Sequence, residues 1–97
     1  MLFIGGEAMI RRGAYQVGEA KRLKLDTLGS RIKGIRLRWG WSQIELAAAL
    51  GVPQQSVSSW ERGKTEPLGP SMAGLCRLLG MTEAELRAEG GFQIPEP

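Results

Sequence analysis

The run from Trp41 to Lys64, WSQIELAAALGVPQQSVSSWERGK, decides how this chain folds. Ser42 followed by Glu45 is the S-x-x-E capping box that opens an α-helix. Gly51 tolerates the left-handed backbone that a sharp reversal needs, so we expect it to end that helix. Pro53 is expected to start another helix, because the first helical position does not need an N–H donor. The stretch therefore predicts two short helices joined by a tight turn.

Apolar residues at helical spacing extend this pattern on both sides. Before the stretch, intervals of four, three and four residues within 28–39 predict a helix that Asp26 or Thr27 can cap. After it, residues 70–79 carry one apolar face, and Thr82 with Glu85 forms a second capping box. The expected core side chains are Leu28, Ile32, Ile35, Trp39, Leu46, Leu50, Val52, Val57, Trp60, Met72, Leu75, Cys76 and Leu79.

Five short helices with short connections predict an all-α, compact domain over residues 27–89. Residues 1–26 are rich in glycine and lack a sustained helical period, so we expect an N-terminal arm or poorly ordered leader there, with short strands at 1–4 and 14–17 as one form of it. Residues 90–97 are expected to trail away as a proline-containing tail. A chain of 97 residues can bury one modest core.

The charge distribution points to a polyanionic partner. The net charge is +3, but residues 1–38 hold nine Lys and Arg against three Asp and Glu, whereas residues 77–97 hold two against four. This asymmetry favours a polyanion bound on one face, although a solvated charged face would give the same counts.

The composition excludes several kinds of site. With one cysteine and no histidine, the chain can form neither an internal disulfide, nor a Cys/His zinc site, nor a histidine-based acid–base pair. We expect no metal and no cofactor, and an enzyme is disfavoured because no nucleophile–base pair is present. No apolar stretch is long enough to span a membrane, and the first residues lack a charged leader. A cytoplasmic protein without a membrane partner is expected.

Adjacent amides at the start of the second helix carry the most specific chemistry. A short helix that begins with Gln54 and Gln55 suits the DNA major groove, where a glutamine amide can pair with the edge of adenine. Gln43 lies at the start of the preceding helix, whose N-terminal dipole favours an anion such as phosphate. These residues predict sequence-specific binding of duplex DNA.

Five motif elements follow one another between Leu28 and Leu86. They are LGSRIKGIR, the SQxxLA pattern from Ser42, LGV at 50–52, SWERGKTEP from Ser59 and LLGMTEAEL from Leu78. Together they resemble the lambda-repressor-like helix-turn-helix family of phage repressors, Cro proteins and XRE-type regulators. The resemblance implies a five-helix DNA-binding domain and a role in transcriptional regulation, most often as a repressor.

The resemblance also implies roles for individual residues. Base contacts are implied for Gln54, Gln55, Ser58 and Ser59. Contacts to the DNA backbone are implied for Gln43, Ser42, Arg62, Lys64, Arg36 and Arg38. Trp60 is expected in the core rather than as a stacking platform for single strands, and Glu61 is expected to pair with a basic residue such as Arg31. Pro53 departs from the family pattern, in which Ser or Thr usually caps the recognition helix.

Several assemblies remain open on the sequence. One recognition helix reads only a few base pairs, so a homodimer on palindromic DNA is expected. The alternative is an antitoxin or phage accessory regulator that binds DNA together with a protein partner, docked through the N-terminal arm or the C-terminal tail. A protein-interaction module that has lost DNA binding is a further alternative, against which the two glutamines and the basic first half argue.

Overall fold

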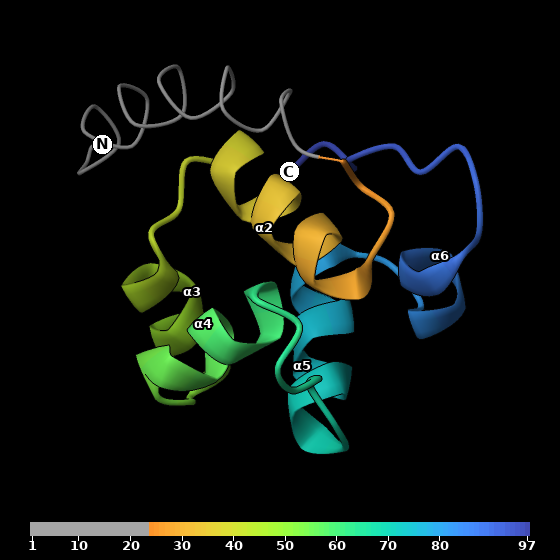
Figure 1. Cartoon of the computed structure of the whole chain (residues 1–97). Helices are drawn as coiled ribbons and strands as arrows, with labels where there is room; N and C mark the ends of the chain where they lie inside the picture. Colours follow the sequence, from red (N-terminus) through yellow and green to blue (C-terminus); the bar gives the residue numbers. More distant parts are fainter. Residues whose placement is uncertain (1–23) are drawn as a thin grey trace.

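The computed structural model describes residues 24–97, and within this range the chain forms five α-helices and no strand (Figure 1). In chain order they are α2 (Leu28–Arg38), α3 (Gln43–Leu50), α4 (Gln54–Glu61), α5 (Pro70–Leu79) and α6 (Glu83–Arg87). The prediction of an all-α fold is confirmed. None of these helices is long and apolar enough to cross a bilayer. Most of the arm predicted at residues 1–26, including both strands suggested there, lies outside the described residues.

Side-chain caps fix where three of these helices begin. Thr27, rather than Asp26, caps α2 through an Oγ1 that accepts from the backbone N–H of Ser30 at 3.0 Å. Ser42 caps α3 and Thr82 caps α6, as the two capping boxes predict. In each box the hydroxyl accepts from the backbone N–H of the glutamate three residues later, and that glutamate's side chain accepts from the backbone N–H of the cap. Gly51 ends α3 in the left-handed conformation at φ 71°, which turns the chain sharply into α4.

The start of one helix differs from prediction. Pro53 takes the N-cap position, where the family usually has Ser or Thr, with an extended backbone at φ −65° and ψ 150°. The first helical residue of α4 is Gln54 and not Pro53. Proline offers no side-chain acceptor, so α4 begins without a side-chain cap. α6 ends at Arg87, with Ala88 as its C-cap.

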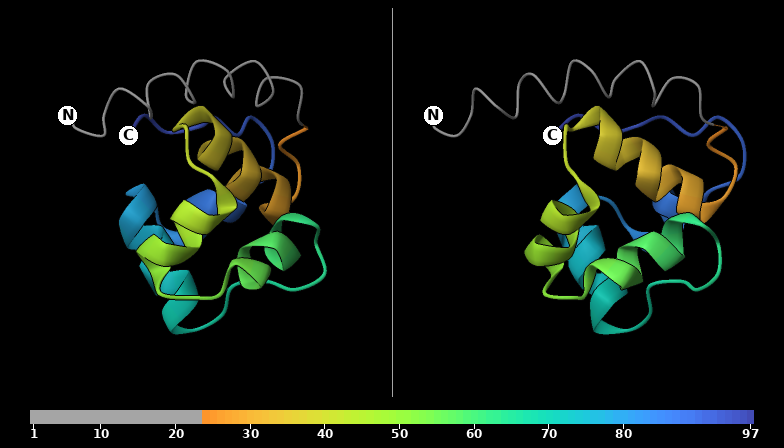
Figure 2. Two further views of the ribbon diagram at one scale, coloured as in Figure 1. Left: turned by 90° about the vertical axis from the view of Figure 1, so that its left-hand side faces the viewer. Right: turned by 60° about the vertical axis from the view of Figure 1, so that its left-hand side comes forward.

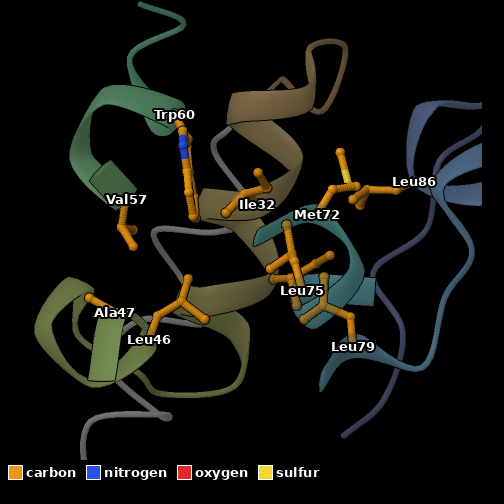
Figure 3. Packing of buried hydrophobic residues seen from close by; sticks show 10 residues of the cluster. Ile32, Leu46, Ala47, Val57, Trp60, Met72, Leu75, Leu79 and Leu86 are labelled. Carbon is orange, nitrogen blue, oxygen red and sulfur yellow. The ribbon is translucent and has the colours of Figure 1, made fainter. Parts of the chain in front are cut away.

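The hydrophobic core takes residues from all five helices. α2 contacts α4 and α6, α3 contacts α4 and α5, and α5 contacts α6. Trp60 is only 5% exposed and extends from α4 toward Ile32 of α2, so its predicted place in the core is confirmed (Figure 3). The buried cluster comprises Ile32, Ile35, Leu46, Ala47, Val57, Trp60, Met72, Leu75, Leu79 and Leu86. The partly buried residues packed against it include Leu28, Trp39, Leu50, Val52 and Cys76.

One glycine sets the approach of α2 to α4. A Cβ atom added to Gly29 would lie 2.2 Å from the carbonyl oxygen of Trp60 and 3.0 Å from that of Glu61. Only a residue without a side chain fits there, because a real Cβ atom would overlap backbone that cannot move aside. Gly29 therefore allows the C-terminal end of α4 to lie directly against the first turn of α2.

The C-terminal segment packs back onto the domain, contrary to the expectation that it trails away. In both views of Figure 2 it runs beside α2. Trp39 Nε1 donates to the carbonyl oxygen of Pro95 at 2.8 Å, and the Phe92 ring lies 4.5 Å from the guanidinium carbon of Arg31. Phe92 and Ile94 are also packed against the core cluster. The segment is thus part of the folded domain.

Candidate nucleic-acid interface

The exposed face of α4 gathers the predicted base-contacting side chains. Gln54 and Gln55 in the first turn are exposed, and Ser58 and Ser59 one turn later are half-buried. With Arg62 they line a hollow of about 350 Å³. The opposite face of the helix is buried in the core, which fixes the direction in which these five polar side chains point.

The turn between α3 and α4 brings two of the predicted contact residues together. Gln54 Nε2 donates to Gln43 Oε1 at 2.9 Å, which joins the first residue of α4 to the first residue of α3. Ser42 lies next to this pair as the cap of α3. One base-contacting candidate and two backbone-contacting candidates therefore form a single polar cluster at the starts of the two helices.

A buried ion pair underlies this cluster. The Glu61 side chain is 3% exposed, and its carboxylate binds the Arg36 guanidinium through Nε at 2.6 Å and Nη2 at 3.0 Å. Glu61 Oε1 also accepts from Gln43 Nε2 at 3.0 Å, and Arg36 Nη1 donates to the Trp41 carbonyl at 2.8 Å. An unbroken chain of hydrogen bonds thus runs from the core to the amide of Gln54.

Two predicted arginine roles need correction. Arg36 was expected to contact phosphate, but its side chain is 8% exposed and its charge is compensated inside the fold by Glu61. Glu61 was expected to pair with Arg31, but its partner is Arg36. Arg31 instead donates to backbone carbonyls of Leu25, Leu86 and Ala88. These contacts assign both arginines to the fold rather than to a DNA surface.

The remaining predicted cations are accessible. Arg62 and Lys64 are exposed directly after α4, and Arg62 Nη1 also donates to Ser58 Oγ at 2.5 Å. Arg38 Nη2 lies 3.5 Å from a carboxylate oxygen of Glu96, with both side chains substantially exposed. Exposed pairs of this kind contribute only about 0–1 kcal/mol, so Arg38 can exchange Glu96 for another anion.

Sequence reasoning missed two features of this surface. It gave no indication that Glu61 binds Gln43 as well as an arginine, because that contact depends on how the ends of two helices meet. It also passed over Ile44, which follows Gln43 and is 65% exposed. A usable signal existed for Ile44, since it lies off the face that carries Leu46 and Leu50.

Residues 24–97 offer little support for a nucleophile or a metal site. Burial raises the pKa of the Cys76 thiol, and the negative charge of Glu83 raises it further. Its Sγ lies 3.8 Å from Met72 Sδ at the edge of the core, so the thiolate needed for a nucleophile is disfavoured. In this part of the chain, no three His, Cys, Asp or Glu side chains are grouped to hold a metal ion.

Comparisons with known proteins match the same part of the chain. A family model described as helix-turn-helix matches residues 32–86, which span α3, α4, α5 and most of α2 and α6. The HTH-type transcriptional regulator DicA of Escherichia coli (strain K12) is 42% identical over 53 residues. That alignment covers 55% of this chain but 39% of DicA, so the chain matches about two fifths of its relative's length. No solved structure matches the chain.

Proposed function

Because this chain belongs to the helix-turn-helix family of Cro- and XRE-type proteins, we propose that it is a transcriptional regulator that binds specific sequences of duplex DNA. The observation that carries this proposal is the pair of exposed amides, Gln54 and Gln55, at the start of α4. α4 would enter the major groove with its first turn against the base edges.

Base reading would depend on the amide groups. A glutamine binds adenine through two hydrogen bonds, from its N–H to N7 and from the adenine amino group to its carbonyl oxygen. Gln54 has both groups available, since its bond to Gln43 occupies only one of its two N–H donors. Ser58 and Ser59 face the same side one turn later and would supply short-range contacts to the next bases.

Phosphate contacts would flank the recognition helix. Gln43 keeps one free N–H at the start of α3, where the helix dipole favours an anion. The Ser42 hydroxyl hydrogen is a further donor at this point, and exposed Arg62 and Lys64 lie beyond the other end of α4. Arg38 is a weaker candidate, because it already lies against Glu96. Affinity should accordingly fall steeply with salt concentration.

Repression by a homodimer is the form of regulation we favour. A single recognition helix reads only a few base pairs, so two copies on a palindrome, with half-sites about one helical turn apart, would supply the missing specificity. A bound dimer over a promoter would exclude polymerase. The similarity to DicA, a transcriptional regulator, supports a regulatory role in general.

A second candidate is an antitoxin or phage accessory regulator that binds DNA with a protein partner. The C-terminal tail is a poor docking arm for this purpose, because Trp39 and Arg31 already hold it against the domain. Co-purification of a second protein with the full chain would favour this candidate over the homodimer.

The proposal is tested by replacing both amides. Gln54→Ala/Gln55→Ala should weaken binding to a preferred site by about 10- to 100-fold, given the usual discrimination of bidentate base contacts, while binding to random DNA stays nearly unchanged. The matched control is Gln93→Ala, which removes an exposed amide from the C-terminal tail. Fluorescence anisotropy on both DNAs measures the effect. Equal losses on the preferred and random DNA would reject base reading by these residues.

A further inference from the structure

The carboxylate of Glu61 joins the fold to the reading surface. It is the last residue of α4, its side chain is 3% exposed, and it holds Arg36 through two hydrogen bonds. The same carboxylate accepts a third bond from Gln43, whose amide in turn binds Gln54. Glu61 therefore connects to a proposed base-contacting residue through a single intermediate side chain.

The acceptor-only chemistry of a carboxylate determines the direction of these bonds. An ionised Glu61 can only accept, so Gln43 must present Nε2 to it rather than Oε1. Gln43 Oε1 then faces Gln54, and Gln54 must donate with its own Nε2. Turning either amide over would set two acceptors or two donors against each other.

We propose that Glu61 is a positioning residue that, through Gln43, fixes the polarity of the Gln54 amide and so favours adenine over guanine at the base that Gln54 reads. This inference rests on the proposed function of Gln54. With the amide fixed, Nε2 can donate to adenine N7 while Oε1 accepts from the adenine amino group. At guanine the same Oε1 would meet O6, which is another acceptor.

The ion pair with Arg36 makes Glu61 suitable for orienting the Gln43 amide. Two bonds to a planar guanidinium hold the carboxylate in one orientation, and Arg36 is itself held by the carbonyl of Trp41. The side chain that orients Gln43 is therefore fixed before any DNA is present. An amide released from the acceptor-only carboxylate could tilt so that Nε2 donates to both N7 and O6 of guanine and Oε1 meets neither acceptor.

The test measures the ratio of the dissociation constants for guanine and for adenine at one base pair. The DNA is a site that the wild-type protein selects from a random pool. Within this site, the base pair to test is the one at which Gln54→Ala lowers the ratio. Glu61→Gln replaces an acceptor-only group with one that both donates and accepts, so Gln43 can take either orientation. We expect the ratio to fall about five- to tenfold, within the range that a bidentate base contact supplies.

Two further variants separate positioning from stability. Arg36→Lys loses the bidentate geometry, so it should lower the melting temperature. It keeps the acceptor-only carboxylate, which alone sets the polarity of Gln43, so the ratio should stay unchanged. Arg36→Gln/Glu61→Gln removes both charges and leaves no unpaired charge in the core. It should show the same reduced ratio as Glu61→Gln.

The outcomes distinguish this inference from the proposed function. If folded Glu61 variants bind both DNAs more weakly by the same factor, Glu61 only supports the fold and the inference is overturned. If Gln54→Ala alters the ratio at no base pair of the selected site, the base-reading role of Gln54 itself fails. A reduced ratio in both Glu61 variants, with an unchanged ratio in Arg36→Lys, supports the inference.

Discussion

Arg31 and Arg36 lie on the same helix but bind different kinds of partner. Arg31 is 5% exposed and donates to three backbone carbonyls at the ends of the domain, while the Phe92 ring covers its guanidinium. Arg36 instead binds Glu61 and the carbonyl of Trp41, which lies just before the N-cap of α3. The sequence could not decide between these partners, because Arg36 and Glu61 are 25 positions apart and meet only once the helices pack.

At the residue scale we predict that Arg31→Met destabilises the fold by about 1–3 kcal/mol, because the carbonyl groups that it satisfies would be left without a donor. Denaturant unfolding followed by tryptophan fluorescence measures the free energy of unfolding. Arg77→Met is the control, since Arg77 is exposed in the last turn of α5, and its effect should stay within about 0.5 kcal/mol. A loss at Arg31 no greater than at Arg77 would contradict the anchoring role.

At the element scale, capping and spacing predicted most of the helices. The capping boxes at Ser42 and Thr82 and the glycine turn at Gly51 lie where the sequence indicated. The start of α4 was wrong by one residue, because proline suits both the N-cap and the first helical position. The need for glycine at position 29 was not predictable, because it arises from the approach of another backbone rather than from helical period.

Two glycines within helices should respond to alanine in opposite directions. Gly29→Ala should destabilise the protein by about 1–3 kcal/mol, because the new Cβ would overlap the carbonyl oxygen of Trp60. Gly74→Ala should stabilise it by roughly 0.5–1 kcal/mol, because alanine favours the helix and the nearest atom outside it, in Leu50, lies 3.6 Å from the new Cβ. Melting temperatures of both variants measure this. An unchanged or raised melting temperature in Gly29→Ala would show that the backbone approach at Gly29 is not limiting, and a lowered one in Gly74→Ala would contradict the open space at Gly74.

At the scale of the whole molecule, the helical core was predictable and the course of the tail was not. Regular apolar spacing identified the buried faces of the helices, including Val57 and Trp60 of α4. Residues 92–97 have no such period, and their contacts depend on donors and rings far away in sequence, such as Trp39 and Arg31. The same reason explains why sequence located the glutamines of the candidate interface but not the ion pair beneath them.

Deletion of residues 92–97 should therefore destabilise the domain rather than remove a free end. We expect a loss of about 1–3 kcal/mol, since Phe92 and Ile94 would no longer cover apolar surface. Tryptophan emission should shift to longer wavelength as Trp39 loses its bond to Pro95 and becomes exposed to water. Gln93→Ala, in the same segment but exposed, should change neither property. An unchanged unfolding free energy in the deletion variant would contradict a folded tail.

Selection of bound sequences from a random pool of duplex DNA tests sequence-specific binding by α4 most directly. Wild-type protein should enrich one motif that contains adenines in two half-sites about one helical turn apart. Under the same conditions, folded Gln54→Ala/Gln55→Ala should retain salt-sensitive binding but enrich no such motif. Enrichment of nothing by the wild type, or of the same motif by the variant, would contradict base reading by these glutamines.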